Sequence, residues 1–252
     1  MRLDYELDEG AERDAAFGFV ILQVDETLEA DLRRLLPDPG LRLYHSRIPS
    51  APEVTVETLP RMAASLTGAA ALLPADVGLD AIGYACTSAA TVMGEGRVSE
   101  LVAAAHPGVP VTNPLTAVKA ACRALGVDRL GLVSPYEPVV SQALREALEA
   151  AGITVSAFGC FEQKEERLVA RISPDSILDA LLAIGGRDCQ AVFAACTNLR
   201  AVEVLAEAER MLGKPVLASN QVMAWHLLRL AGLDAPLGTG GALSAAGLAG
   251  AG

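Results

Sequence analysis

The sequence has few aromatic residues and no excess of basic ones. Phe, Trp and Tyr make up 4% of its 252 residues, whereas hydrophobic residues make up 52%. Ala, Leu and Val therefore supply most of the apolar volume, which is typical of helices packed on a buried parallel sheet. The net charge of −11 and the lack of a basic stripe argue against a nucleic-acid partner, because phosphate binding requires clustered Lys and Arg.

Features of several other protein classes are also missing. No apolar run is long enough and free enough of breakers to span a membrane, and the first fifteen residues lack the apolar core of a secretory signal. We therefore expect a cytoplasmic protein that is not bound to a membrane. No P-loop, Gly-x-Gly-x-x-Gly or Gly-x-Ser-x-Gly motif follows a predicted strand, so NTPase, dinucleotide-binding and hydrolase functions have no support. The three histidines show no ligand spacing, and no metal site is predicted.

The cysteines are odd in number and none forms a Cys-x-x-Cys pair. In a chain without an export signal, this predicts reduced thiols rather than disulfides or zinc ligands. They are Cys86, Cys122, Cys160, Cys189 and Cys196.

Short β-branched segments alternate with longer helical patterns along the chain. Strands are predicted at 17–24, 41–45, 81–86, 109–112, 130–134, 154–158, 191–195 and 216–218. Helices are predicted at 115–125, 137–150, 176–184 and 201–212. This alternation predicts an α/β fold with parallel sheets. Gly126 and Gly152 stand where left-handed C-caps belong, and Ser173 precedes Pro174 as an N-cap does.

An internal repeat divides the chain into two similar halves. Asp-Ala-Ile-Gly-Tyr-Ala-Cys-Thr at 80–87 resembles Gln-Ala-Val-Phe-Ala-Ala-Cys-Thr at 190–197. Each copy continues through a helical pattern to Gly-x-Pro-Val, and then to an Asn that leads into another helix, Asn113 or Asn220. We predict a first lobe formed by 16–112 with 219–240, a second lobe formed by 113–218, and weakly packed termini at 1–15 and 241–252.

Each repeated cysteine, Cys86 and Cys196, ends an apolar strand just before a helical segment. Ligands of open α/β sheets bind beyond the carboxyl ends of the strands, where a helix N-terminus also favours a thiolate. A lone Cys in such a place is more often a buried apolar residue. The repeat reverses that preference, because two lobes facing each other bring two thiols to opposite sides of one substrate. Such a pair can remove a proton from one face and return one to the other, or combine addition with protonation.

Polar neighbours of these cysteines are candidate ligands. Thr87, Ser88, Thr197 and Asn198 are placed to cap the following helices and to hydrogen-bond a substrate carboxylate. Tyr136 follows a predicted strand at the same sheet edge, where its hydroxyl can donate to a substrate oxygen, although a tyrosine in a loop is more often a packing residue.

These motifs together resemble the aspartate/glutamate racemase superfamily, and within it the maleate cis–trans isomerase and arylmalonate decarboxylase group. The similarity spans residues 17–233 and depends on Ala-Cys-Thr-Ser at 85–88, Leu-Val-Ser-Pro-Tyr at 132–136 and Ala-Cys-Thr-Asn at 195–198. It implies two pseudo-symmetric Rossmann-like lobes, each a sheet of about four strands, with a cofactor-free active site between them. It also implies a homodimer or higher homo-oligomer, and a carboxylate-binding role for Tyr136. The decarboxylases keep only the second Cys, so the presence of Cys86 makes decarboxylation the least favoured reaction.

Two positions depart from the maleate isomerase pattern, in which neutral Asn residues hold carboxylates. Asp25 and Glu166 stand at these places, and both anions repel a carboxylate and suit an ammonium or amide group. The same Asp-Glu-Thr and Phe-Glu-Gln segments resemble the ectoine-utilisation branch of the family. The alternative interpretation is that both acids face solvent, as charged loop residues usually do.

Three functions follow from these patterns. The first is an isomerase or racemase that uses two facing cysteines at the carbon next to a carboxylate of a small amino- or amido-acid, such as a diaminobutyrate derivative. The second is maleate cis–trans isomerisation. The third is a binding protein for small molecules without catalysis, because a fold does not dictate a function.

Overall fold

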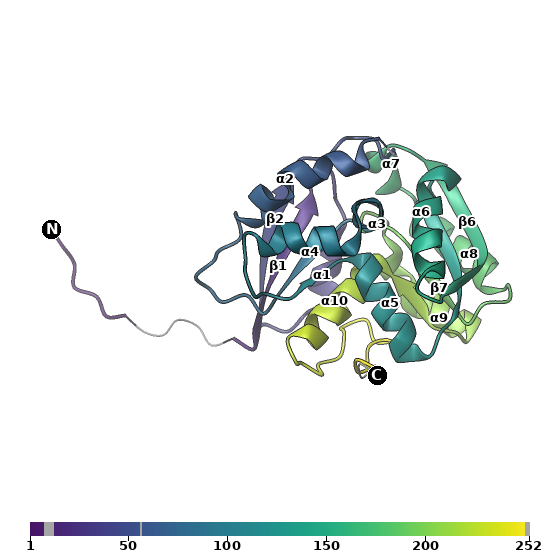
Figure 1. Cartoon of the computed structure of the whole chain (residues 1–252). Coiled ribbons are helices and arrows are strands. Elements are labelled where there is room, and N and C mark those ends of the chain that lie inside the picture. Colours follow the sequence, from purple (N-terminus) through teal and green to yellow (C-terminus); the bar gives the residue numbers. More distant parts are fainter. Residues whose placement is uncertain (8–12, 56, 250–252) are drawn as a thin grey trace.

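Two four-stranded parallel sheets organise the structure, a computed structural model that describes residues 1–7, 13–55 and 57–249 (Figure 1). The first sheet has the order β2-β1-β3-β4 and the second has the order β6-β5-β7-β8. The first sheet contains β1 (Ala15–Leu22), β2 (Leu41–Ile48), β3 (Ala81–Ala85) and β4 (Val111–Thr112). The second contains β5 (Arg129–Tyr136), β6 (Thr154–Gln163), β7 (Ala191–Ala194) and β8 (Val216–Ala218). The predicted fold class is confirmed.

Helices connect the strands and flank both sheets (Figure 1). Those before β5 are α1 (Leu28–Leu35), η1 (Leu59–Met62), α2 (Ala63–Ala70), α3 (Thr87–Met93), α4 (Glu95–Ala103) and α5 (Pro114–Leu125). Those after β5 are α6 (Pro138–Glu149), α7 (Glu166–Val169), α8 (Pro174–Gly185), η2 (Ala201–Glu203), α9 (Leu205–Leu212) and α10 (Ser219–Leu230). No helix among the described residues is long and apolar enough to cross a membrane.

Local signals in the sequence set several helix ends. The Asn113 side chain accepts hydrogen bonds from the first turn of α5, and Pro114 occupies the first helical position, where its missing N–H does no harm. Gly126 ends the same helix in the left-handed conformation, which a residue without Cβ adopts readily. Ser173 caps α8 through a hydrogen bond from Ser176 N. The predicted caps at Gly126 and Ser173 are confirmed, whereas the Asn113 cap was not predicted.

The repeat found in the sequence is a repeat of topology. β3 and β7 occupy the same third place in their sheets, next to β1 and β5. In each sheet that third strand leads through helices to the edge strand, β4 or β8, and then to α5 or α10. The segments that end in Cys86 and Cys196 are therefore equivalent in the two sheets.

Helix α10 returns from the second sheet to the first, where it packs on β3, α1 and α5. Every residue from 219 to 229 is buried, including the polar Ser219, Asn220 and Gln221. A helix that is buried on all sides needs partners for its polar groups, and these partners come from the segments around it.

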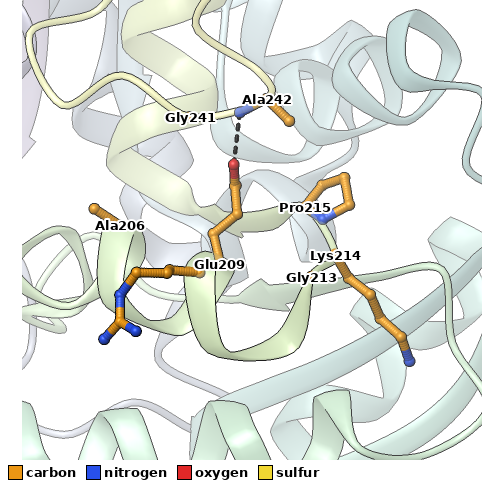
Figure 2. Close-up of a pocket in the computed structure, with 8 residues that line it drawn as sticks. Ala206, Glu209, Gly213, Lys214, Pro215, Gly241 and Ala242 are labelled. Atoms are coloured by element: carbon orange, nitrogen blue, oxygen red, sulfur yellow. Dashed lines mark hydrogen bonds between the residues drawn. The ribbon is translucent and has the colours of Figure 1, made fainter.

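The segment after α10 corrects one prediction, because residues 241–249 do not all pack weakly. Leu243 is 1% exposed, and the guanidinium of Arg229 donates to backbone carbonyls that include those of Ser244 and Ala246. Glu209 on α9 accepts a hydrogen bond from Ala242 N at 2.7 Å (Figure 2). A Gly/Ala-rich segment folds onto the body here because buried donors of α10 require acceptors. Residues 1–7 are exposed, as drawn at the purple end of the chain in Figure 1, whereas 8–12 and 250–252 lie outside the described residues.

Segments of the two lobes pair directly. Glu166 N donates to Pro52 O, and Val54 N donates to Lys164 O, both at 3.0 Å. An antiparallel bridge between Glu53 and Glu165 completes this contact. The chain after β2 therefore lies against the start of α7, close to the predicted site. The lobe boundaries at 112/113 and 218/219 stay an interpretation that follows the two sheets.

Candidate active site

Cys86 lies directly after β3 and is itself the N-cap of α3. Its sulfur accepts a hydrogen bond from Ala89 N at 3.4 Å, and the residue is 6% exposed. We expected Thr87 and Ser88 to cap this helix, and that prediction is wrong because the cysteine takes the position. The Thr87 hydroxyl lies 2.8 Å from the hydroxyl of Ser219 at the start of α10, so it fastens the helix that follows Cys86. Ser88 is only partly buried.

Cys196 lies at the carboxyl end of β7 and is 4% exposed. Its sulfur accepts a hydrogen bond from Asn198 N at 3.3 Å. A turn rather than a helix follows it, so the prediction that Thr197 and Asn198 cap a helix is also wrong. Thr197 instead donates to Ala85 O at 3.3 Å, which joins the loop of the second cysteine to the residue before Cys86.

Burial raises the pKa of both thiols. The pKa of Cys86 rises to about 12, because desolvation outweighs the hydrogen bond from Ala89 N, and the charges of Glu166 and Asp25 add to the rise. Burial also raises the pKa of Cys196 well above its usual value, and the charge of Glu166 is the next cause. Both thiols are therefore protonated at neutral pH, contrary to the expected thiolate. The charges of Glu166 and Asp25, together called the acidic centre below, raise the pKa of both thiols.

Glu166 forms the middle of a buried hydrogen-bond cluster. Its Oε1 accepts from the hydroxyl of Tyr136 at 2.5 Å, and its Oε2 accepts from Asn198 Nδ2 at 2.7 Å. The Tyr136 oxygen also lies 3.1 Å from the sulfur of Cys196. Burial raises the pKa of Glu166, and the hydrogen bonds from Tyr136 and Asn198 oppose that rise. Glu166 is 2% exposed, so the interpretation that it faces solvent is wrong.

Asp25 is also buried, at 4% exposure, in the loop between β1 and α1. Its Oδ1 accepts from the backbone N–H groups of Thr27 and Leu28, at 2.9 and 2.8 Å. Its Oδ2 is buried and has no hydrogen-bond partner among the described residues. Burial raises the pKa of Asp25, and the two backbone N–H groups, the side chain of Thr197 and the charge of Arg47 oppose the rise. Within the described chain, Asp25 Oδ2 thus accepts no hydrogen bond of normal geometry, and the Thr197 hydroxyl, which donates to Ala85 O, is a further donor group beside this carboxylate.

Asn198 ties this centre to the first lobe. Its Oδ1 accepts from Glu26 N at 2.9 Å, and its backbone carbonyl accepts from the hydroxyl of Thr27 at 2.9 Å. Since its Nδ2 holds Glu166, one side chain fixes both the acid and the loop that carries Asp25.

A surface pocket of about 430 Å³ leads to Glu166. It is lined by Gln23, Val24, Glu26, Pro52, Glu165, Glu166 and Arg167. A second pocket of about 480 Å³ lies between α9 and the C-terminal segment and contains none of the predicted site residues (Figure 2). Of these two pockets, the first is therefore the one that reaches a predicted site residue, Glu166. No three His, Cys, Asp or Glu side chains of the described chain are grouped as metal ligands.

Comparisons with known proteins identify the family of the chain. The sequence model described as arylmalonate decarboxylase matches residues 53–243. The chain belongs to the arylmalonate decarboxylase family. A curated relative, the maleate isomerase of Nocardia farcinica, is 28% identical over 235 residues, which cover 89% of this chain and 92% of the relative. The arylmalonate decarboxylase of Bordetella bronchiseptica is 28% identical over 127 residues, 50% of this chain and 53% of that enzyme.

A solved structure of this family shares the fold and contains a cysteine that is covalently bound in an intermediate. It is a Cys-to-Ser variant of the N. farcinica maleate cis–trans isomerase with a covalently bound succinylcysteine intermediate. The two structures share a TM-score of 0.84 and 25% identity, over 92% of this chain and 98% of the isomerase. The predicted similarity to the maleate isomerase and arylmalonate decarboxylase group is confirmed, and with it the prediction that the chain is an enzyme of an isomerase type.

Several residues that support the site were not predicted. Asp31 on α1 accepts from Asn220 Nδ2 at 2.7 Å, and the same amide group donates to Thr197 O at 2.8 Å. The sequence indicates Asn220 only as part of the repeat. Its counterpart Asn113 caps a helix and does not make equivalent contacts. Nothing in the sequence distinguishes Asp31 from an ordinary acidic residue in the first turn of a helix.

Proposed function

We propose that the chain is a cofactor-independent isomerase or racemase that acts, through Cys86 and Cys196, at the carbon next to a carboxylate of a small amino- or amido-acid. The family supports the isomerase chemistry, because its curated relatives include maleate isomerases. The equivalent positions of the two cysteines at the ends of β3 and β7 support a pair of thiols acting from two lobes.

The observation that carries the choice of substrate is the pair of buried carboxylates beside the thiols. Asp25 and Glu166 each raise the pKa of both cysteines, so their charges act throughout the site. Arg47 is the cation that acts on Asp25, and its guanidinium already binds the backbone carbonyls of Leu22 and Asp25. A substrate with two carboxylates adds two further anions to this centre, whereas an ammonium or amide N–H gains an acceptor in Asp25 Oδ2.

The chemistry needs one thiolate and one thiol. The thiolate removes the proton from the α-carbon, breaking the C–H bond, and the electron pair is delocalised into the adjacent carboxylate. The opposite thiol then donates its proton to the other face of the same carbon. The substrate leaves with inverted configuration, and the two sulfurs have exchanged protonation states.

Maleate isomerisation is the second candidate, because the relatives named above carry that activity. In that reaction a thiolate adds to the double bond, the bond between the two central carbons rotates, and elimination gives fumarate. The family supports this candidate, while Asp25 and Glu166 oppose it. A binding protein without catalysis is the third candidate and follows from the fold alone.

Incubation in deuterated water separates these candidates. We expect single enantiomers of diaminobutyrate or its N-acyl derivatives to gain deuterium at the α-carbon and lose optical purity, and we expect maleate to give no fumarate. Fumarate formation without exchange in the amino acids contradicts the proposal and supports maleate isomerisation. Binding by calorimetry with no turnover of either class supports the third candidate.

The oligomeric state and cellular location stay predictions. A homodimer or higher homo-oligomer is expected, and sedimentation of the purified chain tests it.

A further inference from the structure

The hydroxyl of Tyr136 lies between an acid and a thiol. It is 2.5 Å from Glu166 Oε1 and 3.1 Å from the sulfur of Cys196, and all three side chains are buried. Asn198 binds the other carboxylate oxygen and also donates its backbone N–H to the same sulfur. The acid and the thiol are therefore fixed on either side of one hydroxyl group.

The direction of the hydrogen bonds follows from proton count. A phenol carries one proton, and the Tyr136 proton lies toward Glu166, because an ionised carboxylate only accepts. The Tyr136 oxygen is then an acceptor toward Cys196, and the thiol is the donor. Cys196 S–H, Tyr136 O–H and the Glu166 carboxylate thus form a chain in which every donor faces an acceptor.

We propose that Glu166 is the proton acceptor that activates Cys196, with Tyr136 as the relay between them. The Cys196 S–H bond breaks and its proton passes to the Tyr136 oxygen, while the Tyr136 O–H bond breaks and that proton passes to Glu166 Oε1. The products are a thiolate, a neutral tyrosine and a neutral carboxylic acid. One negative charge has moved from the acid to the sulfur, so the charge of the site is unchanged.

This relay gives the two cysteines different roles. The assignment of these roles rests on the proposed function. Cys86 accepts a backbone hydrogen bond from Ala89 N, and no tyrosine or carboxyl group hydrogen-bonds to it among the described residues. Cys196 is therefore the thiol that starts as the base, and Cys86 is the one that starts as the acid. Glu166 thus accepts a proton in the relay, whereas Asp25 is the carboxylate that binds a substrate ammonium group.

Alkylation of the cysteines tests the relay without a substrate. Iodoacetamide reacts with the thiolate, and mass spectrometry of peptides follows Cys196 and Cys86 separately in one sample. At neutral pH we expect Cys196 to react roughly ten-fold or more slowly in Glu166→Gln and in Tyr136→Phe than in the wild-type chain. At high pH, where hydroxide removes the proton directly, we expect the three rates to converge.

The sign of the Glu166→Gln effect distinguishes a relay from simple electrostatics. The charge of Glu166 raises the pKa of Cys196, so its removal without a relay speeds alkylation. Tyr136→Phe keeps that charge, breaks the chain and removes a hydrogen bond that lowers the pKa of Cys196. Slowing in Tyr136→Phe is therefore necessary for the relay, and slowing in Glu166→Gln is the result that distinguishes it. Glu100→Gln is the matched control, because this exposed acid on α4 pairs with Arg97 and does not line the pocket beside Glu166, and we expect wild-type rates for both cysteines.

Two results overturn the relay. One is an unchanged or faster reaction of Cys196 in either variant at neutral pH, and the other is an equal slowing of Cys86, which indicates a general change of the site. If Cys196 shows the expected slowing while neither amino acids nor maleate are turned over, the relay stands and the proposed substrate class fails.

Discussion

The Thr197 hydroxyl donates a hydrogen bond to the carbonyl of Ala85 at 3.3 Å, so the loop that carries one cysteine is attached to the strand that presents the other. Thr197 directly follows Cys196, and Ala85 directly precedes Cys86. This hydrogen bond therefore links the segments that carry the two thiols.

Thr197→Val removes this attachment and nearly preserves the volume of the side chain. We expect a loss of about 1 kcal/mol in the free energy of unfolding, together with a fall in kcat, because misplaced reacting groups slow proton transfer. Thr67→Val is the control, since its hydroxyl donates to Leu101 O at 2.8 Å away from the thiols. A similar fall in kcat in both variants, measured beside urea unfolding, contradicts the account.

The main features of the fold were predictable because they depend on local patterns. All eight strands form, and β8 has the predicted bounds. The ends were less accurate where tertiary contacts extend a strand, as in β6, which continues to Gln163 before the pairing of Glu165 with Glu53. The predicted helix at 201–212 divides into η2 and α9 around Val204.

The candidate site was predictable only in part. The repeat indicates Cys86 and Cys196, because strand ends in equivalent places carry ligand sites. Asp31 was not indicated, because its role depends on a buried amide 189 positions away in the chain. The protonated state of the thiols was not indicated either, since desolvation depends on how both lobes close over them.

The raised pKa of Asp31 should make the stability of the fold depend on pH. Burial raises its pKa from 3.8 to about 7, so between these pH values the folded chain holds a proton that the unfolded chain releases. Its contribution to stability therefore falls as pH rises from 4 to 7, by on the order of 4 kcal/mol. We expect Asp31→Asn to be more stable relative to the wild-type chain at pH 8 than at pH 4, because Asn does not titrate.

Urea unfolding at both pH values measures this difference. Asp179→Asn on the exposed face of α8 is the control, for which we expect the same small effect at both pH values. An Asp31→Asn effect that does not change with pH contradicts the raised pKa of Asp31.

One buried side chain of the C-terminal segment should contribute strongly to the free energy of unfolding. Leu243 is 1% exposed, so Leu243→Ala removes buried contacts and leaves a cavity, and we expect a loss of about 2–5 kcal/mol in the free energy of unfolding. Leu248 is 44% exposed, and Leu248→Ala should change the same quantity by less than about 0.5 kcal/mol. Equal effects in chemical unfolding are the outcome that argues against a packed C-terminal segment.

The proposed reaction requires the thiols of Cys86 and Cys196. It does not require the buried thiols elsewhere in the chain. Cys122 on α5 is fully buried and lies outside the acidic centre. We expect Cys122→Ala to keep the wild-type rate of deuterium uptake at the substrate α-carbon, after correction for the folded fraction by circular dichroism. A loss of uptake in a folded Cys122→Ala variant contradicts the assignment of the chemistry to the other two cysteines.

The most direct test of the central claim is α-proton exchange in the two cysteine variants. A single enantiomer of an N-acyl diaminobutyrate is incubated in deuterated water with Cys86→Ala, with Cys196→Ala and with the wild-type chain. The account predicts deuterium uptake and racemisation by the wild-type chain, and a fall of at least about 100-fold in racemisation by each variant. Full racemisation by Cys86→Ala contradicts the account, because one thiol then suffices for the reaction.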